Sequence, residues 1–110
     1  MVNGKKFRAE LSDTVAAKAL VKKLPITINM KELNGNEKYY YLKSELPAEE
    51  NVSGQIQAGD IMLFGSDCLV LFYKSFQTSY SYTRIGKILN SDKLAEAVGS
   101  GNVDVTIQIR

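Results

Sequence analysis

The segment Cys68–Tyr73 constrains the fold of this chain most strongly, because it reads Cys-Leu-Val-Leu-Phe-Tyr without a charged or amide position. A strand with one face in water alternates apolar and polar residues, whereas a strand covered on both faces is apolar throughout. Gly65–Asp67 makes a tight connection just before this segment. We therefore expect Cys68–Tyr73 to lie at the centre of a sheet, or in a closed barrel that is covered from outside.

Short strands are also predicted for most of the remaining chain. Some segments alternate apolar and polar residues, and others are apolar or rich in tyrosine. These patterns indicate strands over residues 6–11, 26–30, 38–42, 61–64, 76–89 and 102–110. The region 46–58 contains Pro47 and Gly54 and follows no regular pattern. We interpret this region as a surface excursion.

Two short helices complete the prediction. One is expected from about Thr14 to Leu24, with Ser12 or Asp13 as its cap, and the other between Ser91 and Gly99. Two helices are too few for a doubly wound sheet. The residues therefore predict a mainly β domain, which is a barrel or a sandwich with two helical caps.

The N-terminal segment is too short to form a full strand before its first turn. Asn3-Gly4 is a strong signal for a two-residue hairpin, yet only Met1 and Val2 precede it. We expect the first arm of this hairpin to be vestigial or to have been trimmed from a longer protein, and we favour trimming. A missing arm would leave an unpaired strand edge, which predicts pairing with another chain or a weakened barrel.

Length and charge limit the classes of protein to consider. The chain has 110 residues, of which 45% are hydrophobic and 24% charged, with a net charge of +2. We expect one domain over residues 1–110. No apolar run approaches the roughly 20 residues that span a bilayer, and there is no signal-peptide core. The interspersed charges predict no nucleic-acid partner. Cytoplasmic location is the default expectation, or export if an N-terminal segment was removed.

The residue inventory excludes several kinds of active site. The chain contains no histidine, no tryptophan and one cysteine, Cys68. This excludes serine–histidine and cysteine–histidine catalysis, histidine-ligated metals and an internal disulfide. We interpret Cys68 as a buried, inert thiol, because no histidine could activate it. The carboxylates are scattered without metal-ligand spacing, so we expect neither a metal nor another cofactor.

The sequence resembles a known family. The strings that carry the resemblance are Asn3–Lys5, Leu24–Thr27, Gly59–Ile61, Leu71–Phe76 and Ser79–Ile88. They are similar to the small prokaryotic cyclophilin-like domain family, a reduced relative of the cyclophilins, and the similarity covers nearly the whole chain. The resemblance implies a bacterial protein. The resemblance implies a closed β-barrel of eight strands capped by two helices, in which the truncated first strand is the missing hairpin arm.

Cyclophilins proper bind proline-containing peptides and catalyse cis/trans isomerisation of the X-Pro bond. The resemblance implies that their catalytic arginine lies on the strand after the first helix. The matching residues here, Ile26–Met30, include no arginine, and the whole chain has only Arg8, Arg84 and Arg110. The rim tryptophan and histidine of cyclophilins are absent too. No catalytic residue can be assigned by resemblance.

The run of aromatic and hydroxyl residues after Lys74 is the best candidate for a ligand site. In an extended segment, alternate residues share a face, and Arg84 would share it if no bulge intervenes. Rings beside a guanidinium suit a peptide or a planar, anionic ligand. Alternatively, these rings cover one end of a barrel. The candidate ligand-binding residues are Tyr73, Phe76, Thr78, Tyr80, Tyr82 and Arg84.

Two functions from different classes follow from these observations. The first is a non-catalytic module that binds a peptide or a small molecule in an aromatic groove. The alternative is an enzyme, either a divergent peptidyl-prolyl cis-trans isomerase or one that uses tyrosine and arginine. The absence of an arginine from Ile26–Met30 favours the first. An edge-strand dimer, or fusion to another domain, is a further expectation about partners.

Overall fold

Strands dominate the computed structural model, which describes residues 1–52 and 54–109. The helices are α1 (Val15–Val21) and α2 (Leu94–Val98), the second preceded by a 3₁₀ turn over Ser91–Lys93. The strands are β1 (Ala9–Leu11), β2 (Ile26–Leu33), β3 (Glu37–Tyr41), β4 (Asn51–Val52), β5 (Gln55–Ile56), β6 (Asp60–Phe64), β7 (Cys68–Phe72), β8 (Phe76–Gln77), β9 (Ser81–Ile88) and β10 (Val103–Ile107).

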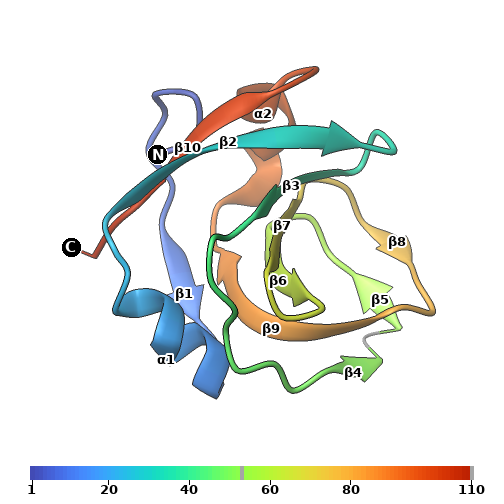
Figure 1. The fold of residues 1–110 in the computed structure, drawn as a ribbon. Coiled ribbons are helices and arrows are strands. Elements are labelled where there is room, and N and C mark those ends of the chain that lie inside the picture. The colour runs from blue at the N-terminus through green and yellow to red at the C-terminus, as the bar shows by residue number, and fades with distance from the viewer. Residues whose placement is uncertain (53, 110) are drawn as a thin grey trace.

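The main sheet is antiparallel and strongly curled (Figure 1). Its strand order is β1-β9-β6-β7-β3-β2-β10, and β4 pairs with β9 beside this path. β5 and β8 form a separate two-stranded ribbon. The prediction of a mainly β fold with two short helices is confirmed. The named strands form a curled, barrel-like sheet, and no ladder joins β1 directly to β10 within the described residues.

The N-terminal residues lie between the two ends of this sheet. Val2 bridges both Val105 of β10 and Lys5, and Asn3-Gly4 forms the expected tight turn with positive φ angles of 49° and 80°. The N–H of Asn3 donates to the carbonyl of Asp104 at 2.9 Å. Val2 is only 3% exposed. A short first arm of this hairpin is therefore paired within the chain, which agrees with the vestigial arm, one of the two alternatives expected from the sequence.

Two apolar clusters lie on opposite faces of the sheet. The interior cluster includes Leu69 and Leu71 of β7, and it is closed by α1 and α2. The second cluster includes Cys68, Val70 and Phe72 of the same strand. We call the face that carries the second cluster the outer face. Because both faces of β7 are covered, all of its residues are buried, which confirms the prediction for this strand.

The region 46–58 is not merely a surface excursion, and that interpretation is wrong in part. Leu46 and Ile56 are buried, at 3% and 0% exposure. Ile56 belongs to the second cluster, and β5, which contains it, pairs with β8. This region therefore covers the outer face, which explains why β7 has no exposed side.

Helix α1 begins later and ends earlier than predicted. Its cap is Thr14, whose hydroxyl accepts a hydrogen bond from the Ala17 N–H at 3.1 Å. The same hydroxyl donates to the carbonyl of Arg84 on β9 at 2.7 Å. Thr14 is therefore the cap in place of Ser12 or Asp13, and its hydroxyl also hydrogen-bonds the start of the helix to the sheet.

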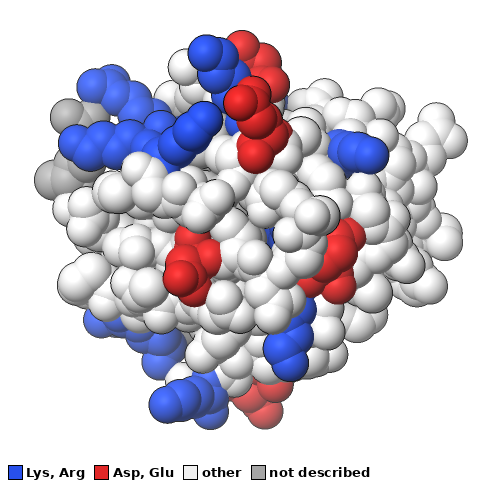
Figure 2. Space-filling view, turned by 90° about the horizontal axis from the view of Figure 1, so that it is seen from above, with Lys and Arg blue, Asp and Glu red and all other residues white. Residues whose placement is uncertain are grey.

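Charges of both signs are interspersed among uncharged residues on the face shown in Figure 2. Among the described residues, no helix has the length and apolar character needed to cross a membrane.

Candidate functional site

A row of aromatic side chains crosses the outer face of the sheet. Tyr41 of β3 and Phe64 of β6 both lie opposite Cys68 of β7 in their ladders. Opposite residues in a ladder point to the same face, and Cys68 belongs to the outer cluster. The ring of Phe64 lies 5.7 Å from the ring of Tyr82 on β9 and 6.1 Å from that of Tyr80. We call Tyr41, Phe64, Tyr80 and Tyr82 the aromatic row.

Much of the aromatic row is exposed to solvent. Tyr41 is 62% exposed, Phe64 45% and Tyr80 63%. A single exposed apolar residue is ordinary, whereas neighbouring exposed rings on one rigid face are typical of a binding surface. The row is therefore a candidate surface for an apolar or aromatic part of a ligand.

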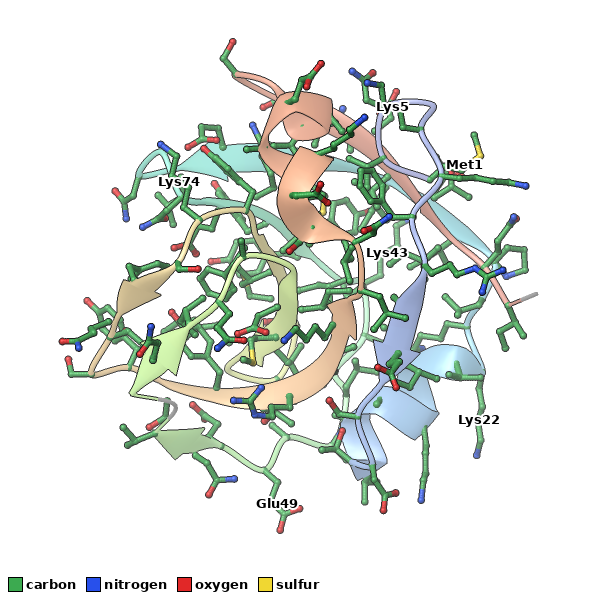
Figure 3. All side chains as sticks on the ribbon, turned by 180° about the vertical axis from the view of Figure 1, so that it is seen from behind. Met1, Lys5, Lys22, Lys43, Glu49 and Lys74 are labelled. Carbon is green, nitrogen blue, oxygen red and sulfur yellow. The ribbon has the colours of Figure 1, made fainter. Side chains whose placement is uncertain are left out.

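A hollow of about 190 Å³ opens at the β9 end of the aromatic row. The residues around it come from the N-terminal cap of α1, from β4 with the segment before it, and from β9. Its lining residues are Thr14, Glu49, Asn51, Val52, Tyr82 and Arg84. The Arg84 side chain is exposed and forms no ion pair within the described part of the chain. The Glu49 side chain points away from the ribbon (Figure 3). The hollow thus combines an aromatic wall with an available guanidinium.

Two of the predicted residues line this hollow, and a third, Tyr80, lies beside Phe64 on the aromatic row. Tyr80 contributes an exposed ring, Arg84 contributes its guanidinium, and Tyr82 forms the wall of the hollow. Tyr82 is only 6% exposed, and its ring packs against Phe72 at 5.5 Å. Burial raises the pKa of the Tyr82 hydroxyl. Tyr82 is therefore both a part of the second cluster and a boundary of the hollow.

The continuous strand expected over 76–89 is interrupted. β8 ends at Gln77 and β9 begins at Ser81. The Thr78 hydroxyl accepts a hydrogen bond from the Tyr80 N–H at 3.1 Å, which turns the chain between the two strands. Phe76 packs on Phe72 in the second cluster. The strict alternation therefore fails at residues 78–80, and neither Phe76 nor Thr78 lines the hollow.

Tyr73 lies in a different polar network. Its hydroxyl donates to Glu32 Oε1 at 2.8 Å, and Lys38 Nζ lies 2.9 Å from the same oxygen. Burial and the adjacent Glu32 raise the pKa of Tyr73 to about 12. The phenol therefore stays protonated at neutral pH. The structure separates Tyr73 from the residues of the hollow.

Lys38 is the most unusual member of this network, because its side chain has no exposed surface. Besides Glu32, its ammonium donates to the carbonyls of Gly99 and Gly101 at 3.0 and 2.5 Å. A buried ammonium is tolerated when it is paired and hydrogen-bonded. Lys38 thereby joins β3 to the loop between α2 and β10, which is a structural role.

Glu37 is a largely buried glutamate on the outer face. It lies opposite Phe72 and is 8% exposed. Its side chain forms no ion pair or hydrogen bond with the residues that the structure describes. Burial, reinforced by the nearby Glu32, raises its pKa. The protonated form of Glu37 is therefore favoured relative to an exposed glutamate.

Cys68 is buried, as predicted. Burial and the negative charges of Asp67 and Glu37 raise the pKa of its thiol to about 11. A thiol with this pKa is protonated at neutral pH and a poor nucleophile. In the described part of the chain, no three acidic or cysteine side chains are grouped as metal ligands.

Most of the residues that surround Tyr82 and Arg84 are not predicted from the sequence. From the sequence, Tyr41 is only one residue of the tyrosine-rich strand predicted over 38–42, and Phe64 only the last residue of the strand predicted over 61–64. Thr14, Glu49, Asn51 and Val52 come from segments far from Arg84 in sequence. The sequence signal that could indicate Tyr41 is the run of three tyrosines, because consecutive residues of a strand point to opposite faces. The pairing of β3, β7, β6 and β9 brings these residues together.

Comparison with known proteins gives one match. The model of a protein family described as the Cyclophilin-like family matches residues 1–108. The search of curated proteins found no match. The search of solved structures found none either.

Proposed function

This chain belongs to the cyclophilin-like family, and from that premise we propose that it is a non-catalytic binding module. Its ligand is a peptide or a small molecule that lies on the aromatic row and reaches into the hollow beside Arg84. The observation that carries the proposal is the exposure of Tyr41, Phe64 and Tyr80 on one rigid face that ends at an available guanidinium.

The arrangement of the row supports binding without large rearrangement. Tyr41, Phe64 and Tyr82 stand on paired strands, and Tyr80 directly precedes β9. The ring of Phe64 packs on that of Tyr82, which belongs to the second cluster. Binding to a preformed surface avoids the entropic cost of ordering loops. Burial of exposed rings provides affinity, while hydrogen bonds to a planar guanidinium orient a polar group of the ligand.

The alternative function is a divergent peptidyl-prolyl cis-trans isomerase. By the resemblance to cyclophilins, the catalytic arginine would be expected on β2, and Ile26–Leu33 contains none. Arg84 is an arginine of the outer face, since it lies opposite Met62 of β6, a member of the second cluster. An isomerase would have to use this guanidinium to polarise the prolyl amide.

One NMR experiment distinguishes the two functions. The ¹⁵N-labelled protein is titrated with a panel of X-Pro peptides, and exchange between the cis and trans peptide signals is measured in the same samples. A binding module gives shift changes at the aromatic row without faster exchange. Accelerated exchange that is lost in Arg84→Ala would establish the isomerase instead. Shift changes confined to other faces would contradict both.

Tyr80 provides the clearest mutational test of the binding surface. Tyr80→Ala removes an exposed ring, so we expect ligand affinity to fall about tenfold with little change in stability. Tyr82→Ala is expected to lower stability by about 3 kcal/mol, because it removes a packed ring from the second cluster. Isothermal titration and urea unfolding measure the two effects.

Leu89→Ala is the matched control, because Leu89 is 51% exposed and lies outside the row and the hollow. Equal loss of affinity in Tyr80→Ala and Leu89→Ala would reject the aromatic row as the binding surface.

A further inference from the structure

A second hollow, of about 210 Å³, lies away from the aromatic row. Its lining residues are Lys5, Lys6, Phe7, Asn90, Asp92 and Lys93. We call it the lysine hollow. None of these residues lines the hollow beside Arg84. Lys5 and Glu49, one from each hollow, lie at opposite ends of the molecule in Figure 3. The lysine hollow is therefore separate from the candidate site described above.

The lysine hollow has an excess of positive charge. Its lining includes three lysines and one carboxylate, that of Asp92. All three lysines are exposed, and neither they nor Asp92 form an ion pair among the residues that the structure describes. Ammonium groups that are gathered without counter-charges repel one another, and an anion bound among them relieves this repulsion. The hollow is therefore suited to an anion.

The backbone segments that carry the lysines are anchored to each other. Lys5 exchanges backbone hydrogen bonds with Val2, at 2.8 and 2.9 Å, across the N-terminal turn. The carbonyl of Arg8 accepts a hydrogen bond from the N–H of Leu89 at 2.9 Å, which joins the two segments that line the hollow. Phe7 packs against the interior cluster. The two walls are therefore in place before a ligand binds, which lowers the entropic cost of binding.

Asn90 adds an uncharged donor to the lining. It directly precedes the 3₁₀ turn over Ser91–Lys93, and its side chain forms no capping hydrogen bond with that turn. A side-chain amide can donate two hydrogen bonds. The lysine hollow thus combines ammonium and amide donors, all of which suit the oxygens of an anion.

This donor set favours a phosphate over a carboxylate. Lysine ammonium groups are compact point charges that bind phosphate, whereas the planar carboxylate is matched best by the fork of an arginine. A phosphate monoester carries about −1.5 to −2 charges at neutral pH, which complements several ammonium groups at once. The hollow is smaller than the roughly 300–1,000 Å³ of sites for drug-sized ligands. A small phosphorylated molecule is therefore the class of ligand that fits.

We propose that the lysine hollow binds a small phosphorylated compound, with Lys5, Lys6 and Lys93 around the phosphate and Asp92 as the acceptor for a hydroxyl group of the same compound. Asp92 repels a phosphate that stands alone, whereas a neighbouring hydroxyl donates a hydrogen bond to this carboxylate. The proposal adds a second binding site to the chain and does not depend on the function of the aromatic row.

An NMR titration with three probes tests the proposal. The ¹⁵N-labelled protein is titrated at constant ionic strength with glycerol 3-phosphate, inorganic phosphate and glycerol. We expect glycerol 3-phosphate to shift the signals of residues 5–7 and 90–93, inorganic phosphate to shift them with lower affinity, and glycerol to have no effect. The absence of shifts with both phosphates would overturn the proposal. Binding to phosphatidylglycerol vesicles without a response to the soluble phosphates would overturn it in favour of a membrane surface.

Variants of the lining separate the two parts of the proposal. Lys5→Ala and Lys93→Ala should each weaken the binding of glycerol 3-phosphate about threefold. Asp92→Ala should instead strengthen the binding of inorganic phosphate and remove the preference for glycerol 3-phosphate. A loss of folding cannot produce this opposite response. An unchanged preference in Asp92→Ala would show that the carboxylate does not accept the hydroxyl, and that part of the proposal would be wrong.

Lys74→Ala is the matched control, because Lys74 is an exposed lysine that lines neither hollow. It removes the same charge as Lys93→Ala and should leave the affinity for both phosphates unchanged. Equal losses of affinity in Lys74→Ala and Lys93→Ala would show that the phosphates respond only to the net charge of the protein, and would overturn the lysine hollow as a site.

Discussion

Glu37 shows how one buried carboxyl group can set the pH dependence of stability. Its pKa is raised in the folded state, mainly by burial. An unfolded chain returns it to the ordinary glutamate value, about 4.3. The contribution of Glu37 to the free energy of unfolding is therefore fully present below the ordinary glutamate pKa. This contribution is lost as the pH rises through the folded-state pKa. Each unit by which the folded-state pKa exceeds the unfolded value costs about 1.4 kcal/mol at neutral pH.

We expect Glu37→Gln to stabilise the protein at pH 7 and to have little effect at pH 3. Urea unfolding of the variant and the native protein across this range gives the difference curve. The difference curve reports Glu37 together with its repulsion of Glu32. The pKa of Glu32 itself is lowered, because hydrogen bonds from Lys38 and Tyr73 outweigh the effect of burial. A variant that is less stable than the native protein at pH 7 would show that the carboxylate is stabilised by its surroundings.

At the scale of elements, β9 organises the site. It pairs with β6 on one side, and with β1 and β4 on the other. Gly86 lies opposite Leu11, and a Cβ atom at this position would lie 2.5 Å from the carbonyl oxygen of Glu10. Since a backbone atom cannot yield as a flexible side chain does, any larger residue must push β1 away from β9.

We therefore expect Gly86→Ala to lower stability by about 1–3 kcal/mol. Lys87→Ala, at the adjacent exposed position of the same strand, should change stability by less than about 0.5 kcal/mol. Urea unfolding monitored by circular dichroism compares the two variants. Native stability in Gly86→Ala would mean that β1 can shift without cost, contrary to the close approach of the two strands.

At the scale of the whole molecule, the N-terminal hairpin occupies the space between the ends of the curled sheet. Val2 is buried in the interior cluster and bridges Val105 of β10. A charged residue at this position would be buried without a partner. Displacement of the first residues would also expose the edge of β10, and an unpaired edge favours association with another chain.

Val2→Asp is expected to lower stability by about 3 kcal/mol and to increase the dimer fraction at high concentration. Val15→Asp is the matched control, since Val15 is 60% exposed on α1. Chemical denaturation and light scattering measure stability and mass. A Val2→Asp protein as stable and as monomeric as Val15→Asp would show that the hairpin does not contribute to closing the sheet.

Several elements could be predicted from sequence because their signals are local. The apolar run of β7 required cover on both faces, and Asn3-Gly4 required positive φ angles that few other pairs adopt. The interruption at 78–80 could not be predicted, because the alternation of residues 76–83 is equally compatible with one strand or two. The break depends on hydrogen bonds of Thr78 to residues on both sides, including the carbonyl of Gly54.

By itself, the sequence determined the family, the mainly β fold and the absence of histidine chemistry, since composition and local periodicity encode these properties. Only the tertiary structure decided which residues share the candidate site. Ladder register placed Tyr41 and Phe64 in line with Tyr82, and the fold brought Thr14 and Asn51 beside Arg84. Register and long-range packing depend on pairing between distant segments, and local patterns do not specify which segments will meet.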